Sequence, residues 1–263
     1  MLTIFTPLYN RKDTLNRLYE SLIRQSCKDF QWVVIDDGST DGSGELLKQL
    51  ITTSPFEVVY KYTPNGGKMR AINEGVQLAK GEYFFIVDSD DYISDNCVEL
   101  ILSSAKDLPS SLGGMIFRKI NLVDNKITGK PFPQKIIDSS PIEIVYRLGI
   151  DGDKAEVFRT SLLKSNPFKV YPREKFVPEA TVWVKIGEEY KMRYIDEGIY
   201  HFEYLEDGYT KNFKSLMQKN PRGFRDYYKF MLILNLPLKN KIKFLIRLIQ
   251  SEYFILTFKG GKN

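Results

Sequence analysis

The sequence predicts an α/β protein with a mixed sheet and crossover helices, followed by a C-terminal helical extension. Over the first hundred residues, short apolar runs alternate with segments whose apolar residues recur every three or four positions. That alternation is typical of strands connected by crossover helices. Near the C-terminus, two longer segments keep the helical spacing with no strand between them. With 263 residues, of which 43% are hydrophobic, the chain is long enough for one such domain with an appendage.

The first part of the chain is expected to run βαβαβαβ. The predicted strands are residues 2–6, 31–35, 57–62 and 83–87. The predicted helices between them are residues 14–25, 44–51 and 68–79, each preceded by turn or capping residues. An open parallel sheet binds ligands at the carboxyl ends of its strands. Polar clusters fall at four of those ends, so we expect one crevice to gather residues 7–10, 36–41, 64–68 and 88–91.

The second part of the domain is predicted as a helix, a strand, a turn-rich excursion and a further mixture of helices and a strand. The predicted elements are a helix at 95–106, a strand at 113–123, helices at 141–148, 160–165 and 179–187, and a strand at 192–200. Helices are expected again at 222–234 and 238–258. We therefore expect a domain over residues 1–212, with halves at about 1–110 and 111–212, and a helical extension over 213–263.

The C-terminal extension is basic. Residues 211–263 carry twelve Lys and Arg and only two acids, Asp226 and Glu252, although the whole chain has a net charge of +5. One interpretation is that the helices lie on an anionic membrane surface, with Phe244, Tyr253 and Phe254 entering the interface. The other is that they pack on the domain or on a second subunit in a homo-oligomer, with a solvated basic face. No nucleic-acid-binding motif accompanies the charge, so nucleic acid is not an expected partner.

The cellular compartment of the protein is predicted from its cysteines and its apolar runs. Cys27 and Cys97 stand alone, without the spacing of a zinc site or a disulfide framework. The first residues resemble a strand rather than a signal peptide, and no run approaches the roughly 20 apolar residues of a spanning helix. We expect a cytoplasmic protein, with peripheral contact at the inner face of the plasma membrane as the alternative that the basic extension leaves open.

The strongest chemical signal is the acidic sequence Asp88-Ser89-Asp90-Asp91, directly after an apolar strand. Two carboxylates one residue apart can share a hard divalent cation, whose remaining positions take phosphate oxygens and water. An acidic turn at this place is otherwise a solvated loop, and Ser94 could cap the helix that follows.

A second polar cluster, residues 36–42, reads Asp-Asp-Gly-Ser-Thr-Asp-Gly and also follows a buried strand. Carboxylates there can accept hydrogen bonds from a base or a ribose hydroxyl. The alternative is a plain turn that caps a helix. Together with Tyr9 at the first strand end, whose ring could stack on a base, the cluster predicts a nucleotide pocket.

The order of these motifs resembles family 2 of the glycosyltransferases, which have the GT-A fold, a Rossmann-like mixed sheet. The resemblance spans roughly residues 3–210. Four segments carry it: Thr6-Pro7-Leu8-Tyr9-Asn10, Asp36 to Asp41, Asn65-Gly66-Gly67-Lys68 with Ala71, Asn73 and Gly75, and Asp88-Ser89-Asp90-Asp91. It implies an inverting transferase that moves a sugar from a UDP-sugar to a glycan or lipid-linked acceptor, with Mn²⁺ or Mg²⁺, in bacterial cell-surface polysaccharide synthesis.

The resemblance also implies roles for individual residues. Pro7, Tyr9 and Asp37 would hold the uracil, and Asn65 and Lys68 would border the nucleotide and its phosphates. In the DxD-like motif formed by Asp88, Ser89 and Asp90, the first carboxylate would approach the ribose or base, and Asp90 would bind the metal.

The catalytic base is expected at Glu179, because residues 176–183 resemble the family's acidic segment at the start of a helix. Many members have a second acid where Ala180 stands, and Asp151 and Asp153 are the reserve candidates. An acid at a helix N-terminus is otherwise only stabilised by the helix dipole.

His201, the single histidine, precedes residues 203–210, which resemble a C-terminal motif of the family. The resemblance implies that His201 completes the metal shell, and the alternative is a structural histidine.

Two other function classes remain open. A sugar-nucleotide nucleotidyltransferase would need an N-terminal Gly-rich loop with Arg and Lys, and residues 6–11 lack it. A non-catalytic sugar-nucleotide-binding protein would keep the pocket without turnover.

Overall fold

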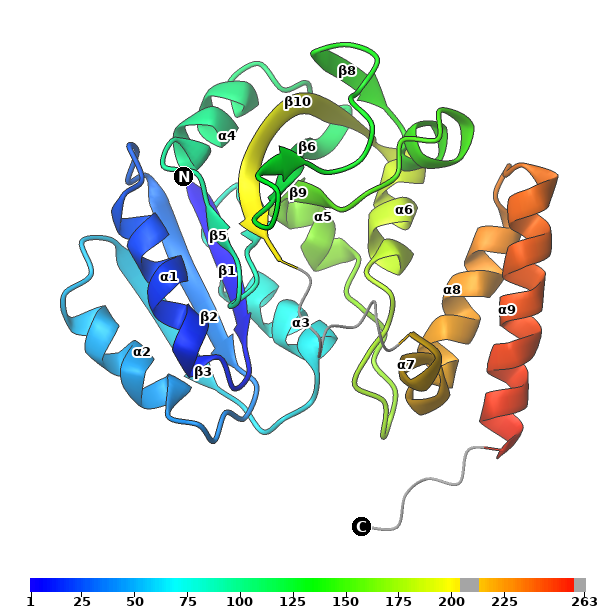
Figure 1. Ribbon diagram of the computed structural model, residues 1–263, viewed down its shortest axis with the longest axis horizontal. Coiled ribbons are helices and arrows are strands. Elements are labelled where there is room, and N and C mark those ends of the chain that lie inside the picture. Colours follow the sequence, from blue (N-terminus) through cyan, green and yellow to red (C-terminus); the bar gives the residue numbers. More distant parts are fainter. Residues whose placement is uncertain (204–212, 258–263) are drawn as a thin grey trace.

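The computed structural model describes residues 1–203 and 213–257, and one mixed sheet forms the centre of this part of the chain (Figure 1). The strand order is β3-β2-β1-β4-β9-β6-β10-β5, with β7 beside β6 and β8 beside β10. The strands are β1 (Leu2–Leu8), β2 (Phe30–Asp36), β3 (Glu57–Tyr62), β4 (Tyr83–Ile86), β5 (Tyr92–Ile93), β6 (Leu112–Asn121), β7 (Lys126–Ile127), β8 (Ile136–Ser139), β9 (Lys154–Arg159) and β10 (Lys191–Phe202).

The first four long strands are parallel, as predicted, because a helix crosses over between each pair. The connecting helices are α1 (Lys12–Ile23), α2 (Ser43–Thr52) and α3 (Lys68–Leu78). Every residue of β2 is buried, which is typical of a parallel strand covered on both faces. Inside this region the Trp32 indole N–H donates to the hydroxyl of Thr6 at 3.0 Å, so both polar groups are satisfied in the core. The predicted βαβαβαβ order is confirmed.

The sequence did not predict β9, which makes the sheet mixed at its centre. This strand pairs antiparallel with β4 on one side and with β6 on the other. Charged residues alternate with apolar ones from Lys154 to Val157, and Phe158 interrupts the alternation before Arg159, so the segment does not stand out as a strand in the sequence. The alternation is nevertheless that of a strand with two different faces.

Helices cover both faces of the sheet and create two separate hydrophobic layers (Figure 1). One layer includes side chains of α1, α2 and α4 (Cys97–Ala105). The other includes side chains of α3, α5 (Thr160–Ser165) and α6 (Ala180–Glu189). A single π-helical turn, η1 (Glu143–Arg147), replaces the predicted helix at 141–148. The predicted α/β class with crossover helices is confirmed.

The C-terminal extension consists of α7 (Phe213–Lys219), α8 (Pro221–Ile233) and α9 (Leu238–Thr257), and it lies to one side of the domain (Figure 1). A third hydrophobic cluster joins these helices to Ile142 and Val184. Phe244 is only 6% exposed and its ring packs edge-on against Tyr146. The expectation that Phe244 enters a membrane interface is therefore wrong, because this side of α9 is occupied by the rest of the protein. Within the described residues, none of the helices has both the length and the apolar character that crossing a bilayer requires.

Candidate functional site

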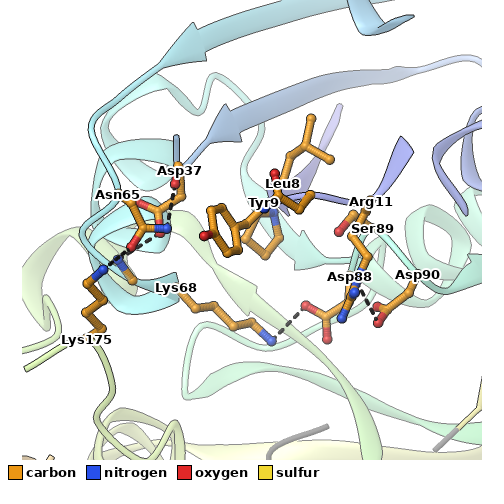
Figure 2. Close-up of a pocket in the computed structure, with 13 residues that line it drawn as sticks. Leu8, Tyr9, Arg11, Asp37, Asn65, Lys68, Asp88, Ser89, Asp90 and Lys175 are labelled. Carbon is orange, nitrogen blue, oxygen red and sulfur yellow. Dashed lines mark hydrogen bonds and ion pairs between the residues drawn. The ribbon is translucent and has the colours of Figure 1, made fainter. Parts of the chain in front are cut away.

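The carboxyl ends of β1, β2 and β4 open into a pocket of about 700 Å³ (Figure 2). All seven residues predicted to bind a nucleotide sugar line it, and so does Asp90. These eight are Pro7, Tyr9, Asp37, Asn65, Lys68, Asp88, Ser89 and Asp90. The polar residues that follow these strands therefore lie together in one pocket, as expected, because neighbouring parallel strands end at the same edge of the sheet.

One end of the pocket is built around Asp37. Its two carboxylate oxygens accept the backbone N–H groups of Gly66 at 2.7 Å and Gly67 at 2.8 Å. Asn65 closes the same corner by donating its side-chain amide to the Asp37 carbonyl at 2.8 Å. Burial raises the pKa of the Asp37 carboxyl, although the two glycine amides act in the opposite direction. Each carboxylate oxygen keeps a further lone pair with which to accept a ligand N–H.

Gly67 is required at this corner by its backbone and by its surroundings. Its φ is +93°, and a Cβ built there would lie 2.0 Å from the carbonyl oxygen of Lys175. Only glycine allows both this conformation and this close approach. As a result, the segment before α6 reaches the first half of the sheet, and the Lys175 ammonium donates to the Asn65 side chain.

Lys68 begins α3 and crosses the floor of the pocket towards the acidic cluster (Figure 2). Its ammonium lies 2.7 Å from an Asp88 oxygen and 2.9 Å from a Glu179 oxygen. Burial lowers the pKa of Lys68, but the two carboxylates outweigh it and raise that pKa well above its ordinary value. Lys68 is therefore a fixed cation that joins the two acids.

The other end of the pocket holds the acidic cluster that follows β4. The guanidinium of Arg11 lies 3.4 Å from the Asp90 carboxylate, and the Asp88 backbone N–H donates to the Tyr200 hydroxyl at 3.0 Å. Burial raises the pKa of Asp88, but Lys68 and Lys119 reverse this, so that the net shift is downward. Burial, and then the charge of Asp88, raise the pKa of Asp90.

The neighbouring Asp91 points away from the pocket and into the protein. The Tyr200 hydroxyl donates to its carboxylate at 2.7 Å, and Asp91 is 7% exposed. Burial, together with the charge of Asp88, raises its pKa to about 7. Of the three acids, Asp88 and Asp90 are thus the two that face the cavity.

The donor set at this end suits a divalent cation held partly by a ligand. Mg²⁺ and Mn²⁺ prefer carboxylate oxygens and are commonly bound by one or two of them together with substrate phosphates. Asp90 is partly buried beside the like charge of Asp88, so a cation there would relieve their repulsion. Within residues 1–203 and 213–257, no group of three or more His, Cys, Asp or Glu side chains forms a complete protein-only metal site.

Glu179, the predicted base, directly precedes α6 and reaches the pocket through its ion pair with Lys68. It is not itself among the residues that line the cavity. The reserve acids Asp151 and Asp153 are exposed in the loop before β9 and do not line the cavity either. Of these candidates, Glu179 is the acid that the structure connects to the site.

His201 lies near the end of β10, away from the lining of the pocket. Its Nε2 is 2.9 Å from the Ser94 hydroxyl, and its ring stacks on Tyr92 with centroids 4.6 Å apart. Burial lowers the pKa of His201. These contacts orient the ring towards β5, and its predicted role as a metal ligand stays a prediction. The motif predicted over residues 203–210 lies almost wholly outside the described residues.

Three residues at or near the site were missed in the sequence. Arg11 and Lys175 line the pocket, and Arg11 could have been found because it follows the first polar cluster directly. Lys175 comes from a loop with no motif of its own. Glu156 on β9 is the third. Burial raises its pKa to about 7, while the charge of Lys119 lowers it and that of Glu179 raises it further.

Comparison with known proteins identifies relatives of this chain. A family model described as "Glycosyl transferase family 2" matches residues 3–176. The chain is 31% identical over 159 residues to a poly(ribitol-phosphate) beta-glucosyltransferase of Bacillus spizizenii, covering 53% of this chain and 25% of the relative. It is 25% identical over 194 residues to a GalNAc(5)-diNAcBac-PP-undecaprenol beta-1,3-glucosyltransferase of Campylobacter jejuni, covering 72% and 60% respectively. Three of the relatives, among them the Bacillus spizizenii protein, are matched over only 36%, 25% and 21% of their own length.

Solved structures share the fold. Residues 1–349 of S. aureus TarS in complex with UDP-GlcNAc superpose with a TM-score of 0.70 at 19% identity, over 96% of this chain and 72% of that one. The mannosyltransferase PcManGT of Pyrobaculum calidifontis, in complex with GDP-Man and Mn²⁺, gives a TM-score of 0.63 at 16% identity, over 100% and 76%. The predicted GT-A architecture is confirmed by this likeness to glycosyltransferases.

Proposed function

We propose, from the premise that this chain belongs to glycosyl transferase family 2, that it transfers a sugar from a UDP-sugar to an acceptor hydroxyl with inversion at the anomeric carbon. The observation that carries the proposal is one pocket of about 700 Å³ that is lined by Asp37 at one end and by Asp88 and Asp90 at the other. Sites for small ligands and cofactors commonly have volumes of about 300–1,000 Å³. The pocket has room for a nucleotide sugar that spans from one end to the other.

The Asp37 end suits the base of the nucleotide. Asp37 has acceptor capacity for a base N–H, and the Tyr9 ring is half exposed and free to stack on the base. Lys68 and the N-terminus of α3 lie between the two ends and favour an anionic pyrophosphate there. UDP is the proposed nucleotide, which agrees with the UDP-GlcNAc bound by the similar TarS structure.

A divalent cation, Mn²⁺ or Mg²⁺, is the proposed cofactor. Asp90 would hold it, with Asp88 beside it, and the cation would neutralise the charge that develops on the leaving pyrophosphate. Arg11, which lies beside Asp90, would have to share or yield that carboxylate.

Glu179 is the proposed base. The acceptor oxygen forms a bond to the anomeric carbon while the bond from that carbon to the UDP oxygen breaks, and the electron pair leaves with UDP. Glu179 takes the proton that the acceptor hydroxyl loses. The Lys68 ammonium holds Glu179 2.9 Å away and Asp88 on its other side, so the base is positioned relative to the donor by one shared cation.

A pair of variants tests the proposal. Glu179→Gln should lower turnover with a UDP-sugar by about 10²–10⁴-fold, the usual contribution of a general base, while UDP binding stays unchanged. Asp90→Asn should weaken the stabilisation that UDP confers in the presence of Mn²⁺. Glu188→Gln is the matched control, because Glu188 is exposed on the same helix as it leads away from the site.

The result also separates the remaining alternatives. A wild-type protein that binds UDP-sugars but neither transfers nor hydrolyses them would support a non-catalytic sugar-nucleotide-binding protein. Release of pyrophosphate from UTP and a sugar phosphate would support a nucleotidyltransferase.

The acceptor is proposed to be a glycan or a lipid-linked glycan in surface-polysaccharide synthesis. The names of the relatives, which include an undecaprenol-linked acceptor and poly(ribitol phosphate), support that class. A domain of residues 1–212 with an extension at 213–263, a cytoplasmic location and a homo-oligomer remain predictions.

A further inference from the structure

Helix α9 has a second apolar face, which the other residues that the structure describes leave open. Six of its apolar side chains are more than half exposed, and we call them the outer stripe: Leu238, Ile242, Ile246, Ile249, Tyr253 and Leu256. Successive members are three or four residues apart, so they lie on one side of the helix. The stripe runs over about 27 Å, nearly the whole length of α9.

The opposite side of α9 is the one that packs on the protein. Phe244 and Ser251 are buried there, and the Phe244 ring contacts Tyr227 and Tyr228 of α8. In Figure 1, α8 stands between α9 and the sheet, and α9 forms the outer margin of the molecule. The outer stripe therefore faces away from the domain.

The borders of the outer stripe are cationic over its N-terminal part. Because successive residues of a helix are rotated by about 100°, Lys239 and Lys243 lie along one edge of the outer stripe and Lys241 lies along the opposite edge. The single acid of α9, Glu252, is paired with Lys229 of α8 at 3.0 Å. An exposed apolar face with basic borders is the pattern of a helix that lies in a membrane interface.

The charges distinguish a bilayer from a second copy of the chain. Two copies joined through the outer stripe with their helices parallel would bring the three lysines of each copy together, and in an antiparallel pair those lysines would lie at opposite ends with no unpaired acid on α9 to neutralise them. An anionic lipid surface supplies that negative charge and accepts the apolar side chains at the same time.

We propose that α9 docks on an anionic bilayer, parallel to its surface, with the outer stripe in the acyl boundary and the three lysines among the headgroups. The helix does not cross the membrane, in keeping with its composition. The proposal is independent of sugar transfer, because docking needs neither donor nor acceptor.

Flotation of the full chain with vesicles tests the proposal. The protein should float with vesicles of 70% phosphatidylcholine and 30% phosphatidylglycerol, and float much less with phosphatidylcholine alone. Ile242→Ser with Ile249→Ser should lose most of the binding, and each Lys→Gln among Lys239, Lys241 and Lys243 should reduce partitioning about five-fold. Val123→Ser is the control, because Val123 is an apolar residue that is 76% exposed outside α9, on the turn between β6 and β7.

Unchanged thermal unfolding and UDP binding would show that the stripe variants remain folded. The proposal is overturned if wild-type protein stays out of the anionic vesicles, or if the Ile242 and Ile249 variant floats as well as wild type. Sedimentation velocity gives the competing result: a dimer that the same variant dissociates, with no vesicle binding, would assign the stripe to self-association.

Discussion

Replacing Lys68 by methionine tests the electrostatic centre of the site. Methionine keeps most of the length of the side chain but removes the ammonium that lies 2.7 Å from Asp88 and 2.9 Å from Glu179. Asp88 then stays close to Asp90 with its main countercharge gone.

The magnitude follows from the two contacts and their exposure. A hydrogen bond to a charged group contributes about 1.5–3 kcal/mol. Asp88 is 30% exposed and Glu179 35%, so water recovers part of each interaction and the lower figure applies. We expect Lys68→Met to lower the free energy of unfolding by about 3 kcal/mol at pH 7.

The pH dependence of this loss is determined by Asp88. Lys68 is the leading cause that lowers the pKa of Asp88 against the effect of burial. Stability from a lowered carboxyl pKa is present above the unfolded-state pKa, about 3.9, and is lost as pH falls through the lower folded-state value. The difference between wild type and Lys68→Met should therefore be full at pH 7 and shrink only below about pH 4.

Urea unfolding of both proteins measures the effect, and Lys61→Met is the control. Lys61 pairs with Glu74 at the same 2.7 Å, but both side chains are almost half exposed. An exposed pair of this kind contributes about 0.5 kcal/mol or less. The reasoning is refuted if Lys68→Met loses no more stability than Lys61→Met.

Three further substitutions probe other features. Gly67→Ala should lower the free energy of unfolding by more than about 2 kcal/mol and weaken UDP binding, because the added Cβ would lie 2.0 Å from the Lys175 carbonyl oxygen. Gly149→Ala is the control: Gly149 has φ +64° and open space around it, so the substitution should cost only the roughly 1–2 kcal/mol of the strained backbone. Equal losses in urea unfolding would contradict the steric argument. Glu156→Gln should raise the free energy of unfolding by up to about 3 kcal/mol at pH 8 and by almost nothing at pH 4.5. The reason is that the folded-state pKa of Glu156 is raised from 4.5 to about 7, so the wild-type protein loses stability as pH rises through that window. A gain of the same size at both pH values would contradict this explanation. Thr6→Val should cost about 1–3 kcal/mol, because it leaves the buried Trp32 N–H without its acceptor, and calorimetry that shows no loss would mean that the indole finds another partner.

The first half of the fold could be predicted because its signals are local. Strands such as β2 contain a continuous apolar run, here residues 32–35, and the helices between them have regular apolar spacing and follow turn residues. The polar strand ends then had to converge, since parallel strands finish at one edge, and this placed Asp37 and Asp90 in one pocket.

The rest of the fold and of the site depends on contacts between residues far apart in the chain, which the sequence does not display. The pairing of β9 with β4 joins residues more than seventy positions apart. Lys175 reaches the pocket only because Gly67 admits its carbonyl. In α9 the helical spacing supports two apolar faces, and the sequence could not say that Phe244 belongs to the packed one and Ile249 to the open one.

The place of β9 in the sheet has a consequence for dissecting the protein. β9 covers the side of β4 that β1 does not, and β9 belongs to the later part of the chain. A fragment ending near residue 110 would therefore expose the Tyr83–Ile86 backbone as an edge strand with bulky apolar side chains. Such an edge is a template for pairing with other chains, so we expect that fragment to aggregate rather than bind nucleotide by itself.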